Sequence, residues 1–277
     1  MNILLIPHWF PPSNAIGAIR PYEMARYLID LGHKVHVITS SEKSAKQDLD
    51  LELDIEGLSV VNISIPFLLE YMESPKNNVT MKVLRRLFYP DHYIVLRKAL
   101  YNECRAAFQG SIDLVISSSQ PFSTHVLARN ISLDLNIPWI ADSRDLWADN
   151  PYRRSILGSK YLDLYYERRV LSDAQACVVT GSGTKAILHN RLPFQSIKVL
   201  RNGADSVGGE FVRADYSDGQ ISILYTGTLY GGRRDLTPLF EALNGSGLNV
   251  AIKFFGSESS YIEQFAKKYS SLLIQDC

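Results

Sequence analysis

The charged residues best suited to chemistry lie in one short stretch that follows an apolar run. Segment 138–152 reads PWIADSRDLWADNPY and contains Asp142, Arg144 and Asp145. Carboxylates in this setting can bind sugar hydroxyls or accept a proton, so Asp142 and Asp145 are the catalytic candidates. The segment also holds two aromatic residues that could wall such a site, Trp139 and Trp147. For Trp139 the core is the default position, and the bland alternative for the charges is an Arg–Asp network that only fixes the loop.

A second candidate site follows the apolar run Asn2–Ile6. Gly17 would let the backbone approach a ligand closely, and Arg20 lies on the first turn of the next helix, where free N–H groups favour an anion. One glycine does not make the dinucleotide fingerprint G-x-G-x-x-G, and the alternative is a turn that simply needs Gly17. His8, at the end of the same run, is a minor candidate, with a partly buried imidazole as the alternative.

A third candidate site is rich in glycine and arginine. Segment 224–236 reads LYTGTLYGGRRDL, in which Gly227 follows an apolar run and Arg233 and Arg234 precede a helical pattern. Close backbone approach beside permanently charged guanidinium groups suits a pyrophosphate. A glycine-rich loop with two solvated arginines is the alternative.

Alternating strand and helix patterns position these segments. The expected strands are Asn2–Ile6, Lys34–Thr39, Leu58–Ile65, Asp113–Ser117, Pro138–Ala141, Gln175–Thr180 and Ile197–Leu200. A helix with Tyr22, Ala25 and Leu28 on one face separates the first two strands, and later helices are expected at Ser123–Leu135, Lys160–Leu171 and Thr184–Leu192. This order predicts a doubly wound α/β domain over 1–201, in which ligands collect at the carboxyl ends of the strands.

A second, shorter α/β pattern follows a linker. Residues 202–220 are rich in Gly, Asp and Ser. Strands at Ile221–Tyr225, Asn249–Phe255 and Ser271–Ile274 then alternate with helices at Asp235–Leu243 and Ser259–Tyr269. Residues 221–277 therefore predict an incomplete second Rossmann-like domain, whose open sheet edge invites self-association.

Composition excludes several classes of protein. The chain has 277 residues, no formal net charge and 46% hydrophobic residues, which is typical of a globular protein without an electrostatic footprint for nucleic acid. Its three scattered cysteines fit neither a metal site nor a disulfide framework, which favours a reducing compartment. The sequence shows no signal peptide and no apolar run long enough to span a bilayer.

One segment has a basic, aromatic and amphipathic pattern. Residues 79–105 contain six Lys or Arg side chains interleaved with apolar ones, against two acidic residues. Such a stretch can lie on an anionic membrane surface, and the alternative is a helical hairpin with a solvated basic face.

Taken in order, these motifs resemble a family of enzymes. The pieces that carry the resemblance are FPP…GAIRPYEMARYLIDLGHKVHVIT, IPWIADSRDLW, ACVVTGS, LRNGAD and ILYTGTLYGGRRDLTPLFEAL. Together they are similar to GT-B glycosyltransferases of the family-4 type, found in cell-surface polysaccharide and lipopolysaccharide assembly. The resemblance implies two Rossmann-like domains, with a nucleotide-diphosphate sugar held mainly by the C-terminal one. It also implies a retaining transfer, without a metal or other cofactor, to a saccharide or lipid-linked acceptor on the N-terminal domain.

The resemblance gives the candidate residues roles. Gly17 would approach the donor phosphates, Arg233 would bind the pyrophosphate, and Arg20, Gly227 and Arg234 would assist. Relatives often have a His-Asp pair where this chain has Arg144 and Asp145, so a histidine role does not transfer. Three residues complete the expected cleft: His8, Arg144 and Asn202, the last within LRNGAD.

The chain departs from the family pattern in its C-terminal part. No stretch resembles the E-x7-E motif that binds donor ribose and sugar, so we expect an N-terminal domain with roughly half a donor domain. The alternative to an enzyme is a binding or assembly module that needs a partner chain to complete the donor site. An epimerase of the same architecture fits less well, because no His, Asp or Glu set suits that chemistry. The expected location is the cytoplasm, with 79–105 at the inner membrane face.

Overall fold

The computed structural model describes residues 1–13, 15–40, 53–64, 69, 88–107, 111–150, 159–203, 219–230, 234–256, 259–270 and 272–276. The chain divides into two compact units, Met1–Ala204 and Asp205–Cys277. Residues 204–218 lie outside the described ranges, so the linker limits expected at 202 and 220 stay predictions.

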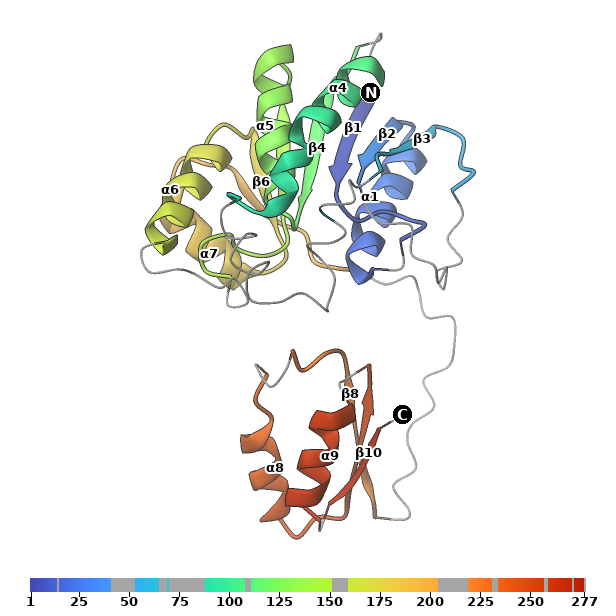
Figure 1. The fold of residues 1–277 in the computed structure, drawn as a ribbon, viewed down its shortest axis with the longest axis vertical. Coiled ribbons are helices and arrows are strands. Elements are labelled where there is room, and N and C mark those ends of the chain that lie inside the picture. Colours follow the sequence, from blue (N-terminus) through green and yellow to red (C-terminus); the bar gives the residue numbers. More distant parts are fainter. Residues whose placement is uncertain are drawn as a thin grey trace. The chain divides into compact units, whose positions relative to one another are not determined.

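The first unit is built on a parallel sheet of seven strands (Figure 1). Its strands are β1 (Asn2–Pro7), β2 (Lys34–Thr39), β3 (Leu58–Asn62), β4 (Leu114–Ser119), β5 (Trp139–Ser143), β6 (Ala176–Val179) and β7 (Ile197–Val199). They are ordered β3-β2-β1-β4-β5-β6-β7. The chain therefore reverses its direction of winding between β1 and β4, which makes the carboxyl ends of these two strands the switch point of the sheet.

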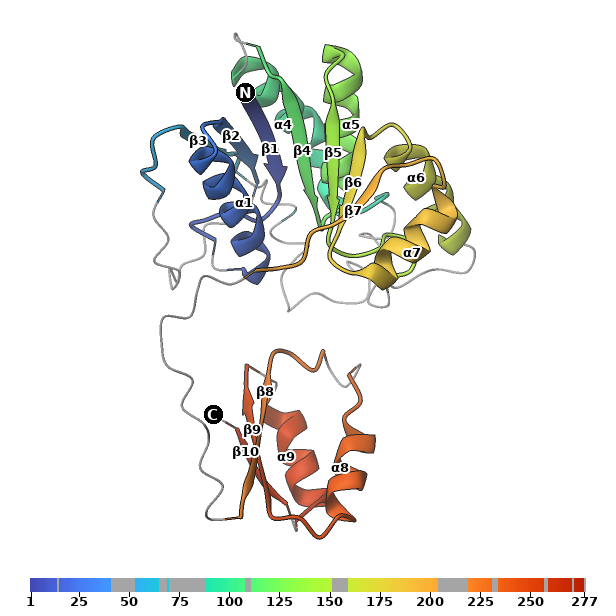
Figure 2. The same cartoon turned by 180° about the vertical axis from the view of Figure 1, so that it is seen from behind.

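Helices cover both faces of this sheet. They are η1 (Ile16–Ala18), α1 (Ile19–Asp30), η2 (His92–Leu96), α4 (Arg97–Ala107), α5 (Ser123–Leu135), α6 (Ser159–Leu171) and α7 (Ser182–Arg191). In β1, Leu4 and Ile6 enter the core beneath α4 and α5, whereas Ile3 and Leu5 enter the core beneath α1. Figures 1 and 2 show these two helical layers from opposite sides. Because both faces are covered at the centre of the sheet, β1 (NILLIP) reads as a continuous apolar run rather than as an alternating pattern.

Two central strands extend beyond their predicted ends. β4 reaches Ser119 and β5 reaches Ser143, where the sequence predicted ends at Ser117 and Ala141. Ser118 of β4 and Asp142 of β5 are thus directly paired within the sheet. Apolar patterning cannot detect these residues, because parallel pairing continues through side chains that are buried but polar.

The second unit is a three-stranded parallel sheet, ordered β10-β9-β8. Its elements are β8 (Ile221–Thr226), α8 (Thr237–Asn244), β9 (Val250–Phe255), α9 (Ser259–Lys268) and β10 (Leu273–Asp276). Phe240 from α8 and Phe265 from α9 pack on Val250, Ile252 and Phe254 of β9. Figure 2 shows both helices on the same face of this sheet.

Several side chains in the described part of segment 79–105 are buried in the core. Tyr93, Leu96, Leu100 and Cys104 are buried in the cluster beneath α4 and α5. Residues 79–87 lie outside the described ranges, and the predicted membrane contact of the whole segment stays a prediction. Among the described helices, none is both long and apolar enough to cross a membrane.

Candidate functional site

The centre of the candidate site is an ion pair between Arg20 on α1 and Asp142 on β5. Nη2 of Arg20 donates to Oδ1 of Asp142 at 2.7 Å, and Nε donates to Oδ2 at 3.0 Å. The hydroxyl of Ser118 on β4 donates to the same Oδ2 at 2.8 Å. Asp142 is fully buried, so both of its oxygens are held by donors within the protein and neither is placed to take a proton from a substrate.

Arg20 also contacts the segment that leaves β7. Its Nη1 donates to Oδ1 of Asn202 at 3.0 Å and to the carbonyl of Arg201 at 3.4 Å. The guanidinium side chain is only 10% exposed. The structure therefore brings the predicted residues Arg20, Asp142 and Asn202 together, in an arrangement that ties α1 and β5 to the end of β7.

A second arginine lies beside the first. Nη1 of Arg144 donates to the Gly17 carbonyl at 3.0 Å, its Nε donates to the Ser119 carbonyl, and the Thr180 hydroxyl donates to the Arg144 carbonyl at 3.1 Å. Burial lowers the pKa of the Arg144 guanidinium, and the negative charge of Asp142 opposes that shift. Arg144 thus braces the Gly17 turn against the carboxyl ends of β4 and β6.

Gly17 occupies a crowded position. A Cβ added there would lie 2.9 Å from Cδ1 of Trp9 and 3.3 Å from Nη1 of Arg144. Contacts this short require a neighbour to move. The structure thus gives Gly17 a packing role, while its predicted approach to donor phosphates stays a prediction.

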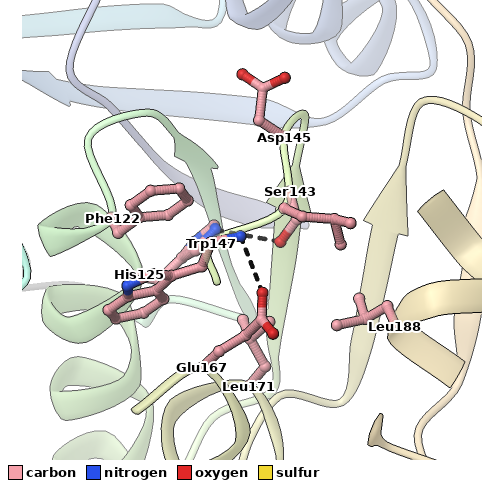
Figure 3. Close-up of a pocket in the computed structure, with 9 residues that line it drawn as sticks. Phe122, His125, Ser143, Asp145, Trp147, Glu167, Leu171 and Leu188 are labelled. Carbon is pink, nitrogen blue, oxygen red and sulfur yellow. Dashed lines mark hydrogen bonds between the residues drawn. The ribbon is translucent and has the colours of Figure 1, made fainter. Parts of the chain in front are cut away.

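Asp145, the other catalytic candidate, is exposed. Nε2 of Gln120 donates to its Oδ2 at 3.2 Å. Figure 3 shows the Asp145 carboxylate pointing away from the pocket beneath it. Of the two candidate acids, only Asp145 is therefore accessible to a ligand.

His8 is buried and separate from this ion-pair cluster. Its Nδ1 lies 2.9 Å from the Ser40 hydroxyl, and its ring lies 4.0 Å from that of Tyr93. Thr39 donates to the His8 carbonyl at 2.6 Å. These contacts fit the partly buried imidazole that the sequence offered as the alternative.

The small pocket below Asp145 contains two buried ionisable groups (Figure 3). Nδ1 of His125 lies 2.7 Å from the Ser117 hydroxyl and Nε2 lies 3.3 Å from that of Ser143, and burial lowers the pKa of His125 to about 4. Glu167 accepts the backbone N–H of Trp147 at 2.9 Å and a guanidinium hydrogen of Arg191 at 2.6 Å. Burial raises the pKa of Glu167. Each group has protein partners, so these two side chains hold β4, β5 and the loop after β5 in place rather than facing a ligand.

The two tryptophans that were expected to wall the site are in the core instead. Trp139 and Trp147 are no more than 1% exposed. Trp139 donates through Nε1 to Ser117 at 2.8 Å, and Trp147 stacks on Phe122 with ring centroids 4.9 Å apart. The aromatic-wall prediction is wrong for both residues, because each indole has a buried polar or aromatic partner behind the loop. The core position that was the default for Trp139 is confirmed.

In the second unit, Gly227 directly follows β8 and has a φ of 123°, a conformation that glycine adopts readily. Arg234 is exposed, its guanidinium lies 5.1 Å from the Tyr230 ring centroid, and Nη1 donates to the Tyr225 hydroxyl at 3.3 Å. Arg233 lies outside the described residues. The loop after β8 thus holds one predicted arginine over an aromatic ring, and the predicted phosphate contacts stay predictions.

Sequence reasoning missed the hydroxyl and amide groups that support the cluster. They are the hydroxyls of Ser118 and Thr180 and the side-chain amide of Gln120, together with the backbone carbonyl of Ser119. The available signal was the run ISSSQ (116–120), in which polar residues end an apolar strand. Within the described ranges, no three His, Cys, Asp or Glu residues form a group that could hold a metal ion. The predicted independence of metal stays a prediction.

Comparison with known proteins places this arrangement in a family. The chain is similar in structure to sucrose-phosphate synthase from Thermosynechococcus elongatus, with a TM-score of 0.68 and 13% identity over 100% of this chain and 70% of that one. It is also similar to Anabaena HepE solved with UDP, with a TM-score of 0.60 and 12% identity over 100% and 69% of the two chains. A third similar structure is the lipopolysaccharide outer core galactosyltransferase WaaB, with a TM-score of 0.57 and 12% identity over 100% and 68%. At these identities the likeness shows the fold, which is GT-B.

No curated protein matches the sequence. The profile of Glycosyltransferase Family 4 matches residues 18–206, which is more than half of the chain. This match covers most of the first unit, including Arg20, Asp142, Arg144 and Asn202. The chain belongs to glycosyltransferase family 4.

Proposed function

We propose that this protein transfers a sugar from a nucleotide-diphosphate sugar to a saccharide or lipid-linked acceptor, with retention of configuration and without a metal ion. Family membership supports the reaction class. The observation that carries the proposal is the exposed carboxylate of Asp145, which follows β5 next to Arg144 and accepts a hydrogen bond from Gln120 after β4. The buried cluster of Arg20, Asp142 and Arg144 holds this edge of the sheet in place, at the carboxyl ends of β4 and β5. Ligands of open α/β sheets bind at such ends, next to the switch point.

The proposed donor is a uridine nucleotide sugar. HepE, which shares the fold, was solved with UDP and with UDP-glucose. In the present chain, the glycine and arginines that follow β8 are the donor-binding candidates, because guanidinium groups bind diphosphate oxygens in a bidentate manner. Arg233 is proposed as the principal phosphate ligand and Arg234 as its neighbour.

The proposed step needs no separate general base. The acceptor hydroxyl oxygen forms a bond to the anomeric carbon while the bond from that carbon to the diphosphate oxygen breaks. The departing diphosphate oxygen takes the hydroxyl proton, and positive side chains stabilise its developing negative charge. The double engagement of Asp142 by Arg20 and Ser118 is consistent with this scheme, because Asp142 then positions other groups rather than accepting a proton.

Calorimetric titration with UDP-glucose and GDP-mannose tests the donor site. We expect the wild-type protein to bind the uridine sugar, and Arg233→Ala to weaken binding by at least about tenfold, as loss of a charge-assisted contact does. Lys253→Ala, which removes an exposed positive charge from β9, is the matched control and should leave affinity unchanged. Equal affinity of the wild type and Arg233→Ala would remove Arg233 from the site, and absence of binding to either sugar would contradict the proposed donor class.

A further inference from the structure

Helix α6 carries its charges in an unusual distribution. Its two acidic residues, Asp163 and Glu167, are 2% and 1% exposed. Asp163 accepts hydrogen bonds from the Tyr89 hydroxyl at 2.9 Å and from Nε1 of Trp147 at 3.2 Å. Glu167 holds the loop after β5 and the guanidinium of Arg191. The acids of this helix therefore face the protein interior and contribute no negative charge to the surface.

The outer side of α6 exposes aromatic and basic side chains. Tyr161 is 80% exposed, Tyr165 is 61% exposed and Leu162 is 43% exposed. Arg168 and Arg169, one turn further on, are exposed as well. Positions 161, 162, 165, 168 and 169 follow the spacing that places side chains on one face of a helix. This face thus combines exposed aromatic and apolar side chains with positive charges, and neither acidic residue of the helix lies on it.

Neighbouring acids only partly offset this charge. Arg169 pairs with Asp173 at 3.3 Å, but Nε of Arg129 donates to the same Asp173 carboxylate at 2.5 Å. Lys160, at the start of the helix, is 63% exposed and lies 3.4 Å from Asp149. Arg169 and Lys160 are themselves 55% and 63% exposed, so their ion pairs contribute little to stability.

We propose that this face of α6, defined by Tyr161, Leu162, Tyr165, Arg168 and Arg169, docks on an anionic lipid surface. Tyrosine suits the boundary between headgroups and acyl chains, because its ring is apolar and its hydroxyl stays hydrated. Arginine beside it attracts the phosphates of anionic lipids. Tyrosine and arginine are also enriched at protein–protein interfaces, so what favours a lipid surface is the excess of positive charge beside the rings, which complements anionic headgroups.

The position of α6 allows such contact. Figures 1 and 2 show α6 on the flank of the first unit, beside the β6 and β7 end of the sheet. The proposal does not depend on segment 79–105, whose described apolar residues are largely buried. It is also independent of the proposed transfer reaction.

Vesicle co-sedimentation tests the proposal on the whole chain. We expect the protein to sediment with vesicles of equal parts phosphatidylcholine and phosphatidylglycerol, and not with phosphatidylcholine alone. Replacing both arginines with Gln should lower the partition coefficient at least about tenfold, because each basic residue near an anionic surface contributes about a fivefold factor. Tyr161→Ser with Tyr165→Ser should lower it by a similar factor, and raising the salt concentration should weaken binding of the wild type.

A tyrosine elsewhere on the first unit provides the matched control. Tyr27 on α1 is 65% exposed, so Tyr27→Ser removes a comparable ring and should leave vesicle binding unchanged. A second measurement introduces Tyr165→Trp and records the quenching of tryptophan fluorescence by brominated lipids. The new indole should be quenched more strongly than the buried Trp139 and Trp147. The proposal is overturned if the wild type does not bind anionic vesicles, or if the α6 variants bind as tightly as Tyr27→Ser. It is equally overturned if those variants change only association between protein molecules.

Discussion

Arg20 and Asp142 are 122 residues apart in the chain, yet the guanidinium of one donates to both carboxylate oxygens of the other. The pair joins the first turn of α1 to the end of β5 across the switch point of the sheet. Arg20 was expected to meet donor phosphates, but its Nε and both Nη atoms already have partners in the protein. Its charge therefore stabilises the buried carboxylate and holds the Asn202 segment in place.

Loss of the Asp142 charge should destabilise the first unit strongly. We expect Asp142→Asn to lower the free energy of unfolding by about 3–5 kcal/mol, because it leaves the nearly buried Arg20 guanidinium without a counter-charge. Chemical denaturation monitored by circular dichroism measures the change. The control is Glu23→Gln, whose exposed partner Arg26 lies 3.3 Å away and which should cost about 0.5 kcal/mol or less. Similar losses for both variants would contradict the structural role of the Arg20–Asp142 pair.

Much of the first unit could be predicted from apolar runs and helical spacing. The β1 and β2 strands and helix α5 lie where the sequence predicts them to within about one residue. The GT-B fold, expected from the motifs, is confirmed by the similar structures. The extensions of β4 and β5 were not predicted because Ser118 and Asp142 are polar. A hydropathy pattern does not show that polar residues can be buried when they take part in an ion pair and its hydrogen bonds.

The side-chain partners were beyond prediction for a different reason. Strand order places the ends of β1, β4 and β5 at one edge, which brings Gly17, Gln120 and Arg144 near one another. Which donor meets which acceptor depends on rotamers and on the exact loop path, and sequence spacing fixes neither. Helix α6 itself lies within one residue of its predicted position, Lys160–Leu171. Its exposed face was not predicted, since its apolar residues occur on both its inner and outer sides and give little amphipathic signal.

Gly17 should tolerate no side chain. In Gly17→Ala the new Cβ would lie 2.9 Å from Cδ1 of Trp9, so we expect the free energy of unfolding to fall by about 1–3 kcal/mol. If the turn also approaches the donor, affinity for UDP-glucose should fall by more than the loss of folded protein explains. Gly183, in α7, is the matched control, because a Cβ there would meet nothing within 4 Å and alanine favours a helix. A thermal midpoint for Gly17→Ala equal to that of the wild type would contradict the crowding.

His125 should make stability depend on pH. Burial lowers its pKa from 6.5 to about 4 in the folded protein, so between these values the unfolded chain binds the extra proton. The contribution of His125 to the free energy of unfolding is therefore complete above pH 6.5. It decreases as the pH falls toward 4, by up to about 3 kcal/mol. Glu167, whose pKa is raised by burial, acts in the opposite sense.

The comparison of wild type with His125→Gln isolates this contribution. Glu167 titrates in both proteins, so the difference between their unfolding free energies reports His125 alone. We expect that difference to shrink steadily between pH 6.5 and 4, measured by urea denaturation at fixed ionic strength. A difference that stays constant over this range would mean that His125 does not titrate on unfolding.

The second unit should self-associate through exposed side chains on one face of its sheet and through its outer strands. Leu224 on β8, Phe255 on β9 and Leu273 on β10 are 61%, 43% and 48% exposed, and both helices pack on the opposite face. β8 and β10 are also the outer strands of the three-stranded sheet, so each can offer unpaired backbone groups to another chain. Sedimentation velocity over a range of protein concentrations should therefore reveal reversible association.

Leu224→Glu is the variant that tests this surface. The new carboxylate would lie beside Lys253, the registered partner of Leu224, so it removes apolar area while adding a favourable cross-strand pair. We expect weaker association with an unchanged unfolding midpoint, whereas Leu248→Glu, at a residue 52% exposed outside the sheet, should associate as the wild type does. If the wild type stays monomeric at every concentration, or if Leu248→Glu disrupts association equally, the sheet face is not the contact. Hydrogen exchange adds an independent criterion, since edge strands that pair between chains gain protection on association and the central β9 does not.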